Sequence, residues 1–390
     1  MNKQLRNNII VLALALFLSF ILNAAHILLP FMFGPIIASI ICVRYLHLEV
    51  NWPFWLSQIG LVLLGVQIGS TFTKEVILDI KDDWFTIVII TVLLLGLALI
   101  IAYFFKKIAK VNTETAILSV IPGALSQMLI MAEENKKADI MVVSLTQTSR
   151  IIFVVILVPF ISYFFKDAQE LATGGSEVTA ILTEALSIPS IIFLTLAVII
   201  VYVIMGKINF PTKQILAPVL ILICWNLLTG ANFTLDNYII AAAQVIYMIR
   251  IGVQIALLLD QMKGRIAVAI AFQNTFLILL AFVMVLIIST FSTHSVNELF
   301  LGAAPGGMSQ IVIVALETGA DVALISSYHI FRIFFILFLI APAINVFLKH
   351  REKNLTKQMI FLIRHLNNIS TIIYYYFYTQ YYDIERVRPC

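Results

Sequence analysis

Long apolar segments separated by short polar ones recur along the whole chain. Most of them approach the roughly 20 residues that an α-helix needs to cross a bilayer. The pattern predicts an all-α, polytopic membrane protein whose main partner is the lipid bilayer. The clearest segments are Ile9–Leu22, Trp84–Phe105, Met141–Phe165, Ile188–Met205, Asn237–Leu259, Ile266–Thr290 and Val322–Leu348.

The first apolar segment has two interpretations. It follows Lys3 and Arg6, and the "NAAH" at residues 23–26 resembles a signal-peptide cleavage site. Because so many apolar segments follow it, we expect residues 1–27 to remain as an uncleaved leading transmembrane helix. A cleaved signal peptide is the alternative.

Composition agrees with a membrane protein. Of the 390 residues, 61% are hydrophobic and 12% are charged, and the mean hydropathy is +1.02. A water-soluble domain of this size needs more charge to cover its surface. The three cysteines are too few and too scattered for a disulfide framework or a thiolate metal site, so we expect no cofactor. No basic stripe with interleaved aromatics is present, which argues against a nucleic-acid partner.

Lysine and arginine cluster in short segments between the apolar ones, for example at Lys106, Lys107 and Lys110. The positive-inside rule assigns such clusters to the cytoplasmic side. We therefore expect a multi-pass protein of the cell (cytoplasmic) membrane with a cytoplasmic amino terminus. The mixed-charge loop Lys74–Asp83, the segment Lys166–Leu186 and the loop Phe291–Glu298 are expected outside.

One stretch of the chain occurs twice. "IPGALSQMLIMAEE" (121–134) and "APGGMSQIVIVALE" (304–317) share seven of fourteen positions at a constant offset, 305 − 122 = 183. Matching blocks lie on either side, in the same order, and they indicate an internal duplication. These blocks are "LGVQIG" (64–69) with "IGVQIA" (251–256), Asp139 with Asp321, and Arg150 with Arg332.

The duplication divides the chain into five parts. We expect the leading helix 1–27, a first membrane repeat 28–166, an external linker and bridging helix 167–206, a second repeat 207–348, and an atypical C-terminal tail 349–390, to which we assign no function.

The relation between the repeats depends on how the Pro-Gly segments run. Helices near 9–29, 31–47, 53–72 and 84–105 deliver the chain to the cytoplasm, and the first Pro-Gly segment has basic residues at both ends. This favours two inverted repeats, each with about four transmembrane helices and a re-entrant Pro-Gly half-helix. If the Pro-Gly segments cross the membrane fully, the copies are parallel instead.

The broken segments contain the strongest candidates for a solute-binding site. A proline disrupts a helix interior but suits the first position of a new helix. We expect Pro122 and Pro305 each to begin a half-helix, ending at Glu134 and Glu317. The free amide groups at its start attract anions. The other candidates at the breaks are Gly123, Ser126, Gln127, Gly306, Ser309 and Gln310.

Two arginines are expected at the same depth as the breaks. In a hairpin, Arg150 falls level with Gly123 and Arg332 falls level with Gly306, which favours binding of an anion. Alternatively, each arginine caps free carbonyls at the break, or pairs with an acid, and is purely structural. An intramembrane arginine costs roughly 2.5–3.5 kcal/mol on insertion scales, so it needs a function or a firm partner.

Other polar residues are weaker candidates. Asp139 and Asp321 are expected to cap helix amino ends. The small-residue spacing in "GVQIG" and "GVQIA" predicts close helix packing. The weaker site candidates are Gln67, Gln254, His329 and Arg250.

The paired motifs "PGALSQ" and "PGGMSQ", each followed by an aspartate and a mid-helix arginine, resemble the AbrB-type integral membrane protein family. The resemblance covers about residues 28–348. It implies a duplicated domain in the cytoplasmic membrane and a loose connection with regulation of gene expression, without an established substrate. Some members are catalogued as an ammonia monooxygenase. The tail 349–390 departs from the family pattern.

Three functions remain open. The leading one is a secondary transporter or exporter of a small anionic or zwitterionic solute, coupled to H+ or Na+ and influencing gene expression indirectly. A membrane sensor that regulates gene expression through a partner is the alternative. An ammonia monooxygenase is a remote third, because the six histidines show no metal-ligand spacing and we expect no enzyme activity. A homo-oligomer is a candidate assembly.

Overall fold

The computed structural model describes residues 3–27, 29–123, 125–135, 137–165, 182–208, 210–230, 233–348 and 350. The chain forms two compact units, Met1–Ile336 and Leu337–Cys390, and each is described by itself. In the second unit the described residues are helical. The predicted tail 349–390, apart from residue 350, lies outside the described residues, as does most of the segment Lys166–Leu186 that was expected outside the membrane.

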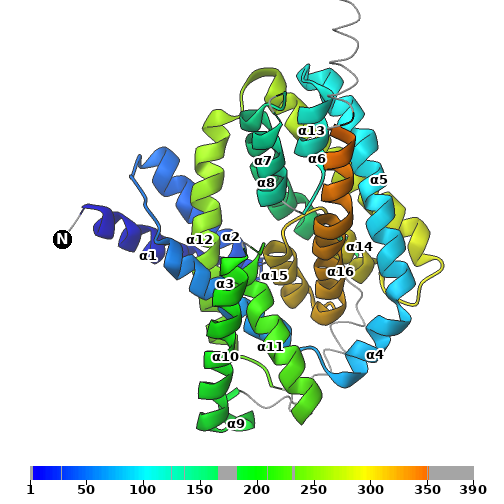
Figure 1. The fold of residues 1–390 in the computed structure, drawn as a ribbon. Coiled ribbons are helices and arrows are strands. Elements are labelled where there is room, and N and C mark those ends of the chain that lie inside the picture. Colours follow the sequence, from blue (N-terminus) through cyan, green and yellow to red (C-terminus); the bar gives the residue numbers. More distant parts are fainter. Residues whose placement is uncertain are drawn as a thin grey trace, which may run out of the picture. The chain divides into compact units, whose positions relative to one another are not determined.

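Every regular element within the described residues is a helix (Figure 1). In chain order they are α1 (Lys3–Ala24), α2 (Pro30–Ile40), the π-helical turn η1 (Ile41–Tyr45), α3 (Phe54–Ser70), α4 (Lys74–Asp82), α5 (Trp84–Ala109), α6 (Thr113–Val120), α7 (Leu125–Glu134), α8 (Ile140–Phe164), α9 (Leu182–Ala185), α10 (Ile188–Lys207), α11 (Lys213–Thr229), α12 (Asn237–Gln261), α13 (Gly264–Ser289), α14 (Val296–Ala303), α15 (Met308–Thr318), α16 (Val322–Phe335) and the π-helical turn η2 (Ile336–Ile340).

Seven helices in the described part are long and apolar enough to cross a membrane. They are α1, α5, α8, α10, α12, α13 and the continuous segment Val322–Leu348, which includes α16. These are the seven segments predicted from the apolar pattern, so the prediction of an all-α, polytopic membrane protein is confirmed.

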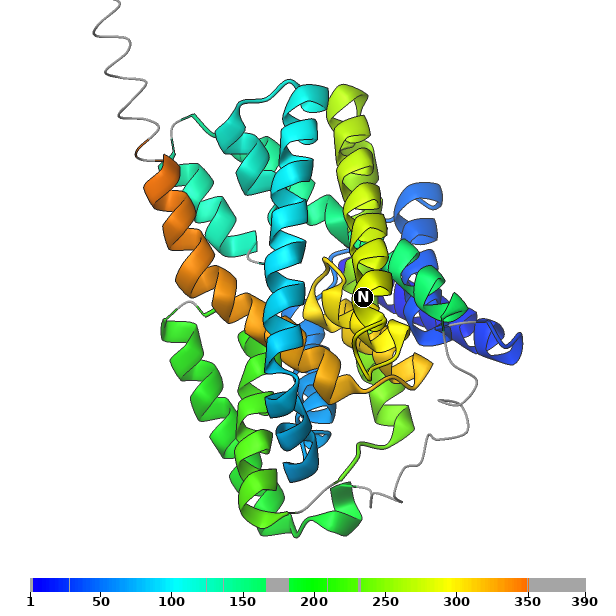
Figure 2. The same ribbon diagram turned by 90° about the vertical axis from the view of Figure 1, so that its right-hand side faces the viewer.

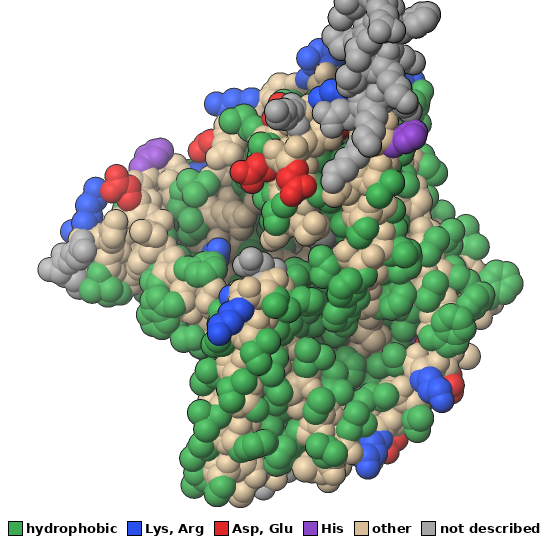
Figure 3. Space-filling view, viewed as in Figure 1, with side chains coloured by type: hydrophobic (Ala, Val, Ile, Leu, Met, Phe, Trp, Pro, Cys, Tyr) green, Lys and Arg blue, Asp and Glu red, His purple; other side chains and the backbone are tan. Residues whose placement is uncertain are grey.

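The surface of the membrane helices is apolar, as contact with lipid requires. On α10, Ile188, Phe193 and Ile200 are all exposed. Figure 3 shows hydrophobic side chains over α10 and α11, while charged side chains gather near α4. Apolar helix surfaces of this kind indicate contact with the bilayer.

The predicted loop Lys74–Asp83 is wrong, because most of this segment is helix α4, bent 82° from α3. The Thr73 side chain caps α4 by accepting a hydrogen bond from the Val76 amide. Val76, Ile77 and Ile80 pack against the core, and the charged residues lie on the other face. The mixed charge therefore marks an amphipathic helix.

Most of the helices form two groups according to which neighbours they pack against. We call α1, α2, α3, α10, α11 and α12 the first group, and α5–α8 with α13–α16 the second group. Within the first group, glycines allow close crossings. A Cβ atom at Gly65 would lie 2.6 Å from Pro218 Cγ on α11, and one at Gly252 would lie 2.7 Å from Ser39 Cβ on α2. The predicted close packing at the "GVQIG" and "GVQIA" segments is confirmed.

The first Pro-Gly segment is the tip of a helical hairpin made by α6 and α7. The Asn112 side chain, at the start of α6, donates to the Lys137 carbonyl, just beyond α7. The Asp139 amide donates to the Thr115 hydroxyl at 2.9 Å. The chain therefore enters and leaves this hairpin at the same end, as the re-entrant alternative predicts.

The second Pro-Gly segment forms the corresponding hairpin from α14 and α15. The Asp321 amide, beyond α15, donates at 3.4 Å to the carboxylate of Glu298 in the first turn of α14. Asp321 also caps α16 and Asp139 caps α8, each accepting from backbone amides of the following turn. Both predicted caps are confirmed.

The predicted half-helices need one correction. Pro122 and Pro305 do not begin α7 and α15, which start at Leu125 and Met308, and a further short helix precedes each proline. The residues before the prolines, Ile121 and Ala304, have ψ angles of 122° and 130°. Proline forces its predecessor out of the helical region, so α6 and α14 end there.

The two hairpins begin at opposite ends of one helix pair. Figure 2 shows α5 and α13 side by side and antiparallel, and the two helices pack closely. The first hairpin follows the end of α5 and the second follows the end of α13. An inverted duplication would produce this arrangement.

Candidate functional site

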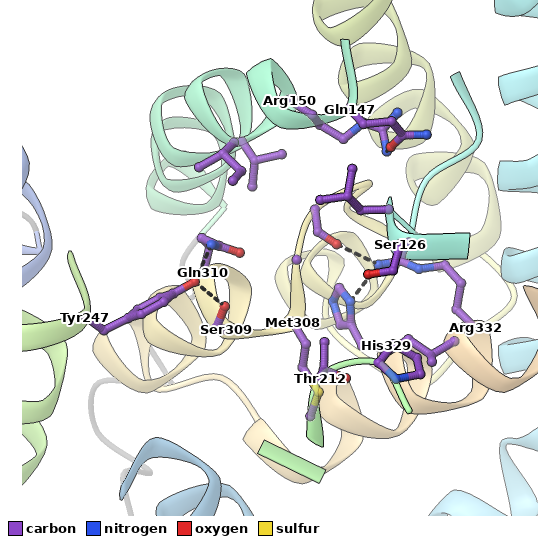
Figure 4. A pocket seen from close by; sticks show the side chains of 18 residues that line it. Ser126, Gln147, Arg150, Thr212, Tyr247, Met308, Ser309, Gln310, His329 and Arg332 are labelled. Carbon is purple, nitrogen blue, oxygen red and sulfur yellow. Dashed lines mark hydrogen bonds between the residues drawn. The ribbon is translucent and has the colours of Figure 1, made fainter. Parts of the chain in front are cut away.

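A cavity of about 320 Å³ lies between the tips of the two hairpins. The first hairpin contributes Gly123 and Ser126, and the second contributes Gly306, Ser309 and Gln310. Figure 4 shows Ser126 apart from Ser309 and Gln310. Its remaining lining residues are Leu125, Gln147, Arg150, Ile151, Val154, Pro211, Thr212, Tyr247, Gly307, Met308, His329, Arg332 and Ile333. Both predicted arginines and residues from both predicted breaks therefore meet at one place.

Arg150, near the middle of α8, caps the carboxyl end of α6. Its Nη2 donates to the carbonyls of Ser119 (3.3 Å) and Val120 (2.9 Å), and its Nη1 donates to the Ile121 carbonyl at 3.4 Å. Nη1 also donates to Gln147 Oε1 at 3.1 Å. The guanidinium thus satisfies carbonyls that the proline break leaves without helical partners, at the negative end of the helix dipole.

Arg332, on α16, makes the corresponding contacts with the second hairpin. Its Nη1 donates to the carbonyls of Ala303 (3.4 Å) and Ala304 (2.9 Å), and its Nη2 donates to the Gly306 carbonyl at 3.2 Å. Carbonyl capping, which was the structural alternative for the arginines, is therefore present in both hairpins. It does not exclude a binding role, because both side chains also line the cavity.

A neutral side chain orients each guanidinium. Arg332 Nη2 contacts His329 Nδ1 at 2.6 Å, and arginine can only donate, so Nδ1 is the acceptor. The imidazole proton is therefore on Nε2, which donates to the Leu301 carbonyl at 3.0 Å. In the first hairpin Gln147 corresponds to His329, because it accepts from Arg150 and its Nε2 donates to the Leu118 carbonyl at 2.8 Å.

Gln147 is, like Thr212 and Tyr247, a cavity residue that the sequence did not single out. Its position carried a signal, because 329 − 147 = 182 is the offset that also relates Arg150 and Arg332. A glutamine and a histidine do not match in a sequence comparison. Their common role appears only when both are seen to accept from the neighbouring arginine.

The two guanidinium charges have no carboxylate partner in the part of the chain that the structure describes. Arg150 is 5% exposed and Arg332 is 3% exposed. None of the described residues that line the cavity is an aspartate or glutamate, and neither arginine forms an ion pair with any of them. Buried charges are normally paired. The cavity is therefore electropositive and suited to an anion.

Tyr247 connects the second hairpin to α12. Its hydroxyl lies 2.8 Å from Ser309 Oγ and accepts a hydrogen bond from Gln310 Nε2 at 2.7 Å. Figure 4 shows these three side chains meeting on one side of the cavity. Gln310 Oε1 is buried without a hydrogen-bond partner among the described residues, so it is a neutral acceptor available to a ligand in the cavity.

The tip glycines hold each hairpin against the other half of the site. Gly123 has a φ of +105°, a conformation that glycine adopts easily, and a Cβ atom there would lie 3.1 Å from Ile336 Cδ1. A Cβ atom at Gly306 would lie 2.7 Å from Val154 Cγ1 on α8. The cavity is thus formed jointly by both hairpins and by α8 and α16.

Several predicted candidates lie outside the cavity. Pro122 and Pro305 shape the breaks without lining it, and Gln127 and Gln254 do not line it. Gln67 accepts from the Leu235 amide at 2.9 Å and so fastens the segment before α12. The Arg250 guanidinium lies 4.1 Å from the centre of the Phe54 ring, a cation–π contact that explains this unmatched arginine.

Within the described ranges, no group of three or more His, Cys, Asp or Glu side chains could hold a metal ion.

Comparison with known proteins identifies the family. The chain is 24% identical over 349 residues to the Escherichia coli (strain K12) protein named "Putative regulator AbrB", covering 87% of this chain and 94% of that protein. It is 23% identical over 304 residues to the protein YhjN of Bacillus subtilis (strain 168), covering 74% and 77%. The family model described as "Transition state regulatory protein AbrB" matches residues 31–348. With the predicted resemblance confirmed over almost the same range, the chain belongs to the AbrB family.

Proposed function

We propose that this protein is a secondary carrier for a small anionic solute. The observation that supports it best is the pair of buried arginines, Arg150 and Arg332, on one cavity that has no carboxylate among its described lining residues. A bound anion would supply the missing negative charge. The amino end of α15, which no side chain caps, adds backbone amide groups at the cavity.

The cavity volume limits the size of the solute. The cavity volume is about 320 Å³. This is the lower end of the range for small-molecule sites. A simple carboxylate is small enough to fit.

A zwitterionic solute is the second candidate. Its carboxylate would face the arginines, and its ammonium group would find only neutral acceptors, such as Gln310 Oε1 and the Tyr247 hydroxyl. A buried ammonium group is poorly stabilised by neutral acceptors alone. An anion without an ammonium group is therefore favoured.

The arrangement of the hairpins favours a carrier over an enzyme or a channel. Broken helices that meet within the span, in repeats of opposite direction, are typical of secondary transporters. We propose that the repeats are inverted copies, with residues 28–166 forming one and 207–348 the other. The distribution of Lys and Arg supports a location in the cytoplasmic membrane with the amino terminus inside.

The names of the relatives add a regulatory candidate. The family description and the Escherichia coli relative's name both refer to regulation. We propose that any influence on gene expression is indirect and follows the concentration of the transported solute. A deletion strain distinguishes indirect regulation through the solute concentration from direct signalling by a membrane sensor. A transcript change that persists when the solute concentration is held constant would favour the sensor.

Binding by the purified protein tests the carrier proposal. We would measure the melting temperature (Tm) of the wild-type protein in detergent with potassium salts of small monocarboxylates, dicarboxylates, phosphate and sulfate. Potassium chloride at equal ionic strength is the control. We expect one class of small anion to raise Tm in a saturable way. The proposal would be contradicted if amines raised the Tm and none of these anions did. Metabolite profiling of deletion and overexpression strains would then identify the solute.

A further inference from the structure

The carboxyl ends of the two short helices α6 and α14 each form a cluster of backbone carbonyl oxygens. In the first, the carbonyls of Ser119, Val120 and Ile121 lie 2.9–3.4 Å from Arg150 nitrogens. In the second, the carbonyls of Ala303 and Ala304, and that of Gly306 just beyond the break, lie 2.9–3.4 Å from Arg332 nitrogens. Carbonyl oxygens grouped at the negative end of a helix dipole form a site for a cation.

Carriers with broken helices use such ends in a defined way. Helix amino ends face the anionic groups of the solute, while unwound carbonyls and helix carboxyl ends coordinate the coupling Na+ or H+. In this protein the carbonyl ends already hold a positive charge that is part of the chain.

We propose that Arg150 and Arg332 are resident cations that take the place of a coupling ion at the two carbonyl ends, so that neither end binds Na+. The inference rests on the proposed carrier function. It assigns the arginines a role that anion binding alone does not require.

The environment of each guanidinium supports permanent occupation. Both side chains are almost fully buried, and each has two Nη atoms donating to the break and to one neutral acceptor. The acceptors are Gln147 Oε1 and His329 Nδ1. A carboxylate in their place would cancel the positive charge, whereas these two orient the guanidinium and leave its charge intact.

A Na+ ion at either end would compete for oxygens that are already used. It would also lie beside a guanidinium, and two like charges within a few ångströms in a poorly solvated site repel strongly. Without the arginine side chain the carbonyl cluster should attract a cation, because its partial negative charges would no longer be balanced by the guanidinium.

The first test measures Tm of the purified protein in sodium chloride and in choline chloride at equal ionic strength. We expect no difference for the wild type. We expect Arg150→Ala and Arg332→Ala to lower Tm, and millimolar methylguanidinium chloride to restore part of the loss by occupying the empty site. Arg250→Ala is the matched control, because Arg250 contacts the Phe54 ring instead of carbonyls. Methylguanidinium should not raise the Tm of Arg250→Ala.

Saturable stabilisation of the wild type by Na+, or retention of radioactive Na+ by the wild-type protein, would overturn the proposal. The proposal would also be overturned if methylguanidinium raised the Tm of all three alanine variants equally, or if it raised the Tm of neither Arg150→Ala nor Arg332→Ala. If the alanine variants do not fold, Arg150→Lys and Arg332→Lys keep the charge and should remain indifferent to Na+; a Na+-specific Tm increase in them would also overturn it. The anion panel is a separate measurement, so failure of the carrier proposal is recognisable by itself.

Discussion

At the scale of single residues, Arg150 and Arg332 each bring a positive charge to the cavity and each cap backbone carbonyls. Substitutions can separate these two roles. Leucine removes both the charge and the capping of the carbonyls, and an unsatisfied buried group costs on the order of 1–3 kcal/mol. Lysine keeps the charge but loses the planar fork. We expect both leucine variants to lose stabilisation by anions and to have a lower Tm, whereas the lysine variants keep weakened anion binding.

Anion binding per folded molecule, measured by titration of purified protein, decides between the roles of the arginines. Leucine variants that are less stable but bind the anion with wild-type affinity would show that the arginines are purely structural.

The glycine at the first hairpin tip gives a second prediction. Gly123 has a φ of +105° and lies against Ile336, so Gly123→Ala should lower stability by about 1–3 kcal/mol. Gly96 is the matched control, since it lies within α5 and a Cβ atom there would meet nothing within 4 Å. Gly96→Ala should raise stability by about 0.5–1 kcal/mol. Thermal unfolding of both variants tests this, and equal effects would contradict the tip geometry.

Residue positions within one hairpin could be predicted from the sequence, but contacts between elements could not. The regular rise of a helix is enough to place Arg150 level with Gly123. The link from Tyr247 to Ser309 and Gln310 depends on how α12 packs against α15, and neither spacing nor composition reports that. The contact between Arg250 on α12 and Phe54 on α3 also depends on how two helices pack, so it could not be predicted either.

At the scale of elements, length explains which helices could be predicted. The seven long apolar segments are unmistakable, whereas α6 and α14 have only eight residues each, about two turns. Their amino ends did carry start signals. Asn112 caps α6, and Ser295 forms a capping box with Glu298 on α14. Such signals define short helices only when the break that follows them is also recognised.

The base of the second hairpin should make stability depend on pH. Asp321 is an exposed residue whose carboxyl group lies near Glu298, and His294 contacts both Asp83 and Glu298. Desolvation by the neighbouring groups at the hairpin base, reinforced by the Glu298 carboxylate, raises the pKa of Asp321 above its usual value. The folded state therefore binds this proton more tightly than the unfolded state, and stability falls as pH rises from the usual aspartate pKa through the raised one.

Asparagine at position 321 can still cap α16 but does not ionise. We expect the Tm of Asp321→Asn, relative to the wild type, to increase as pH rises through that window. Melting curves of both proteins from mildly acidic to neutral pH measure the difference. A difference that does not change with pH would contradict the assigned pKa shift.

At the scale of the whole first unit, the cavity lies where the two helix groups meet. Thr212 and Tyr247 come from the first group or the segment leading into it, and the hairpin tips come from the second group. A solute held there would contact both groups at once. Movement of one group against the other would then change access to the solute, which is the behaviour expected of a carrier.

The opposite directions of the two hairpins lead to a prediction about topology. If α5 and α13 cross the membrane antiparallel, the base of the first hairpin is cytoplasmic and the base of the second is external. Lys137 and Thr293 are both exposed positions near these bases, whereas Thr318 is fully buried and unsuitable as a probe. In a variant without native cysteines, a membrane-impermeant thiol reagent applied to intact cells should label Thr293→Cys and leave Lys137→Cys unlabelled.

Permeabilised cells provide the control, because both cysteines should then react and show that each position is accessible. The basic residues Lys110 and Lys137 flank the first hairpin, so the positive-inside rule independently assigns its base to the cytoplasm. Labelling of both positions from the same side would mean that the hairpins open toward one side of the membrane. The inverted arrangement would then be wrong, and a carrier that alternates between two faces through these hairpins would lose its structural basis.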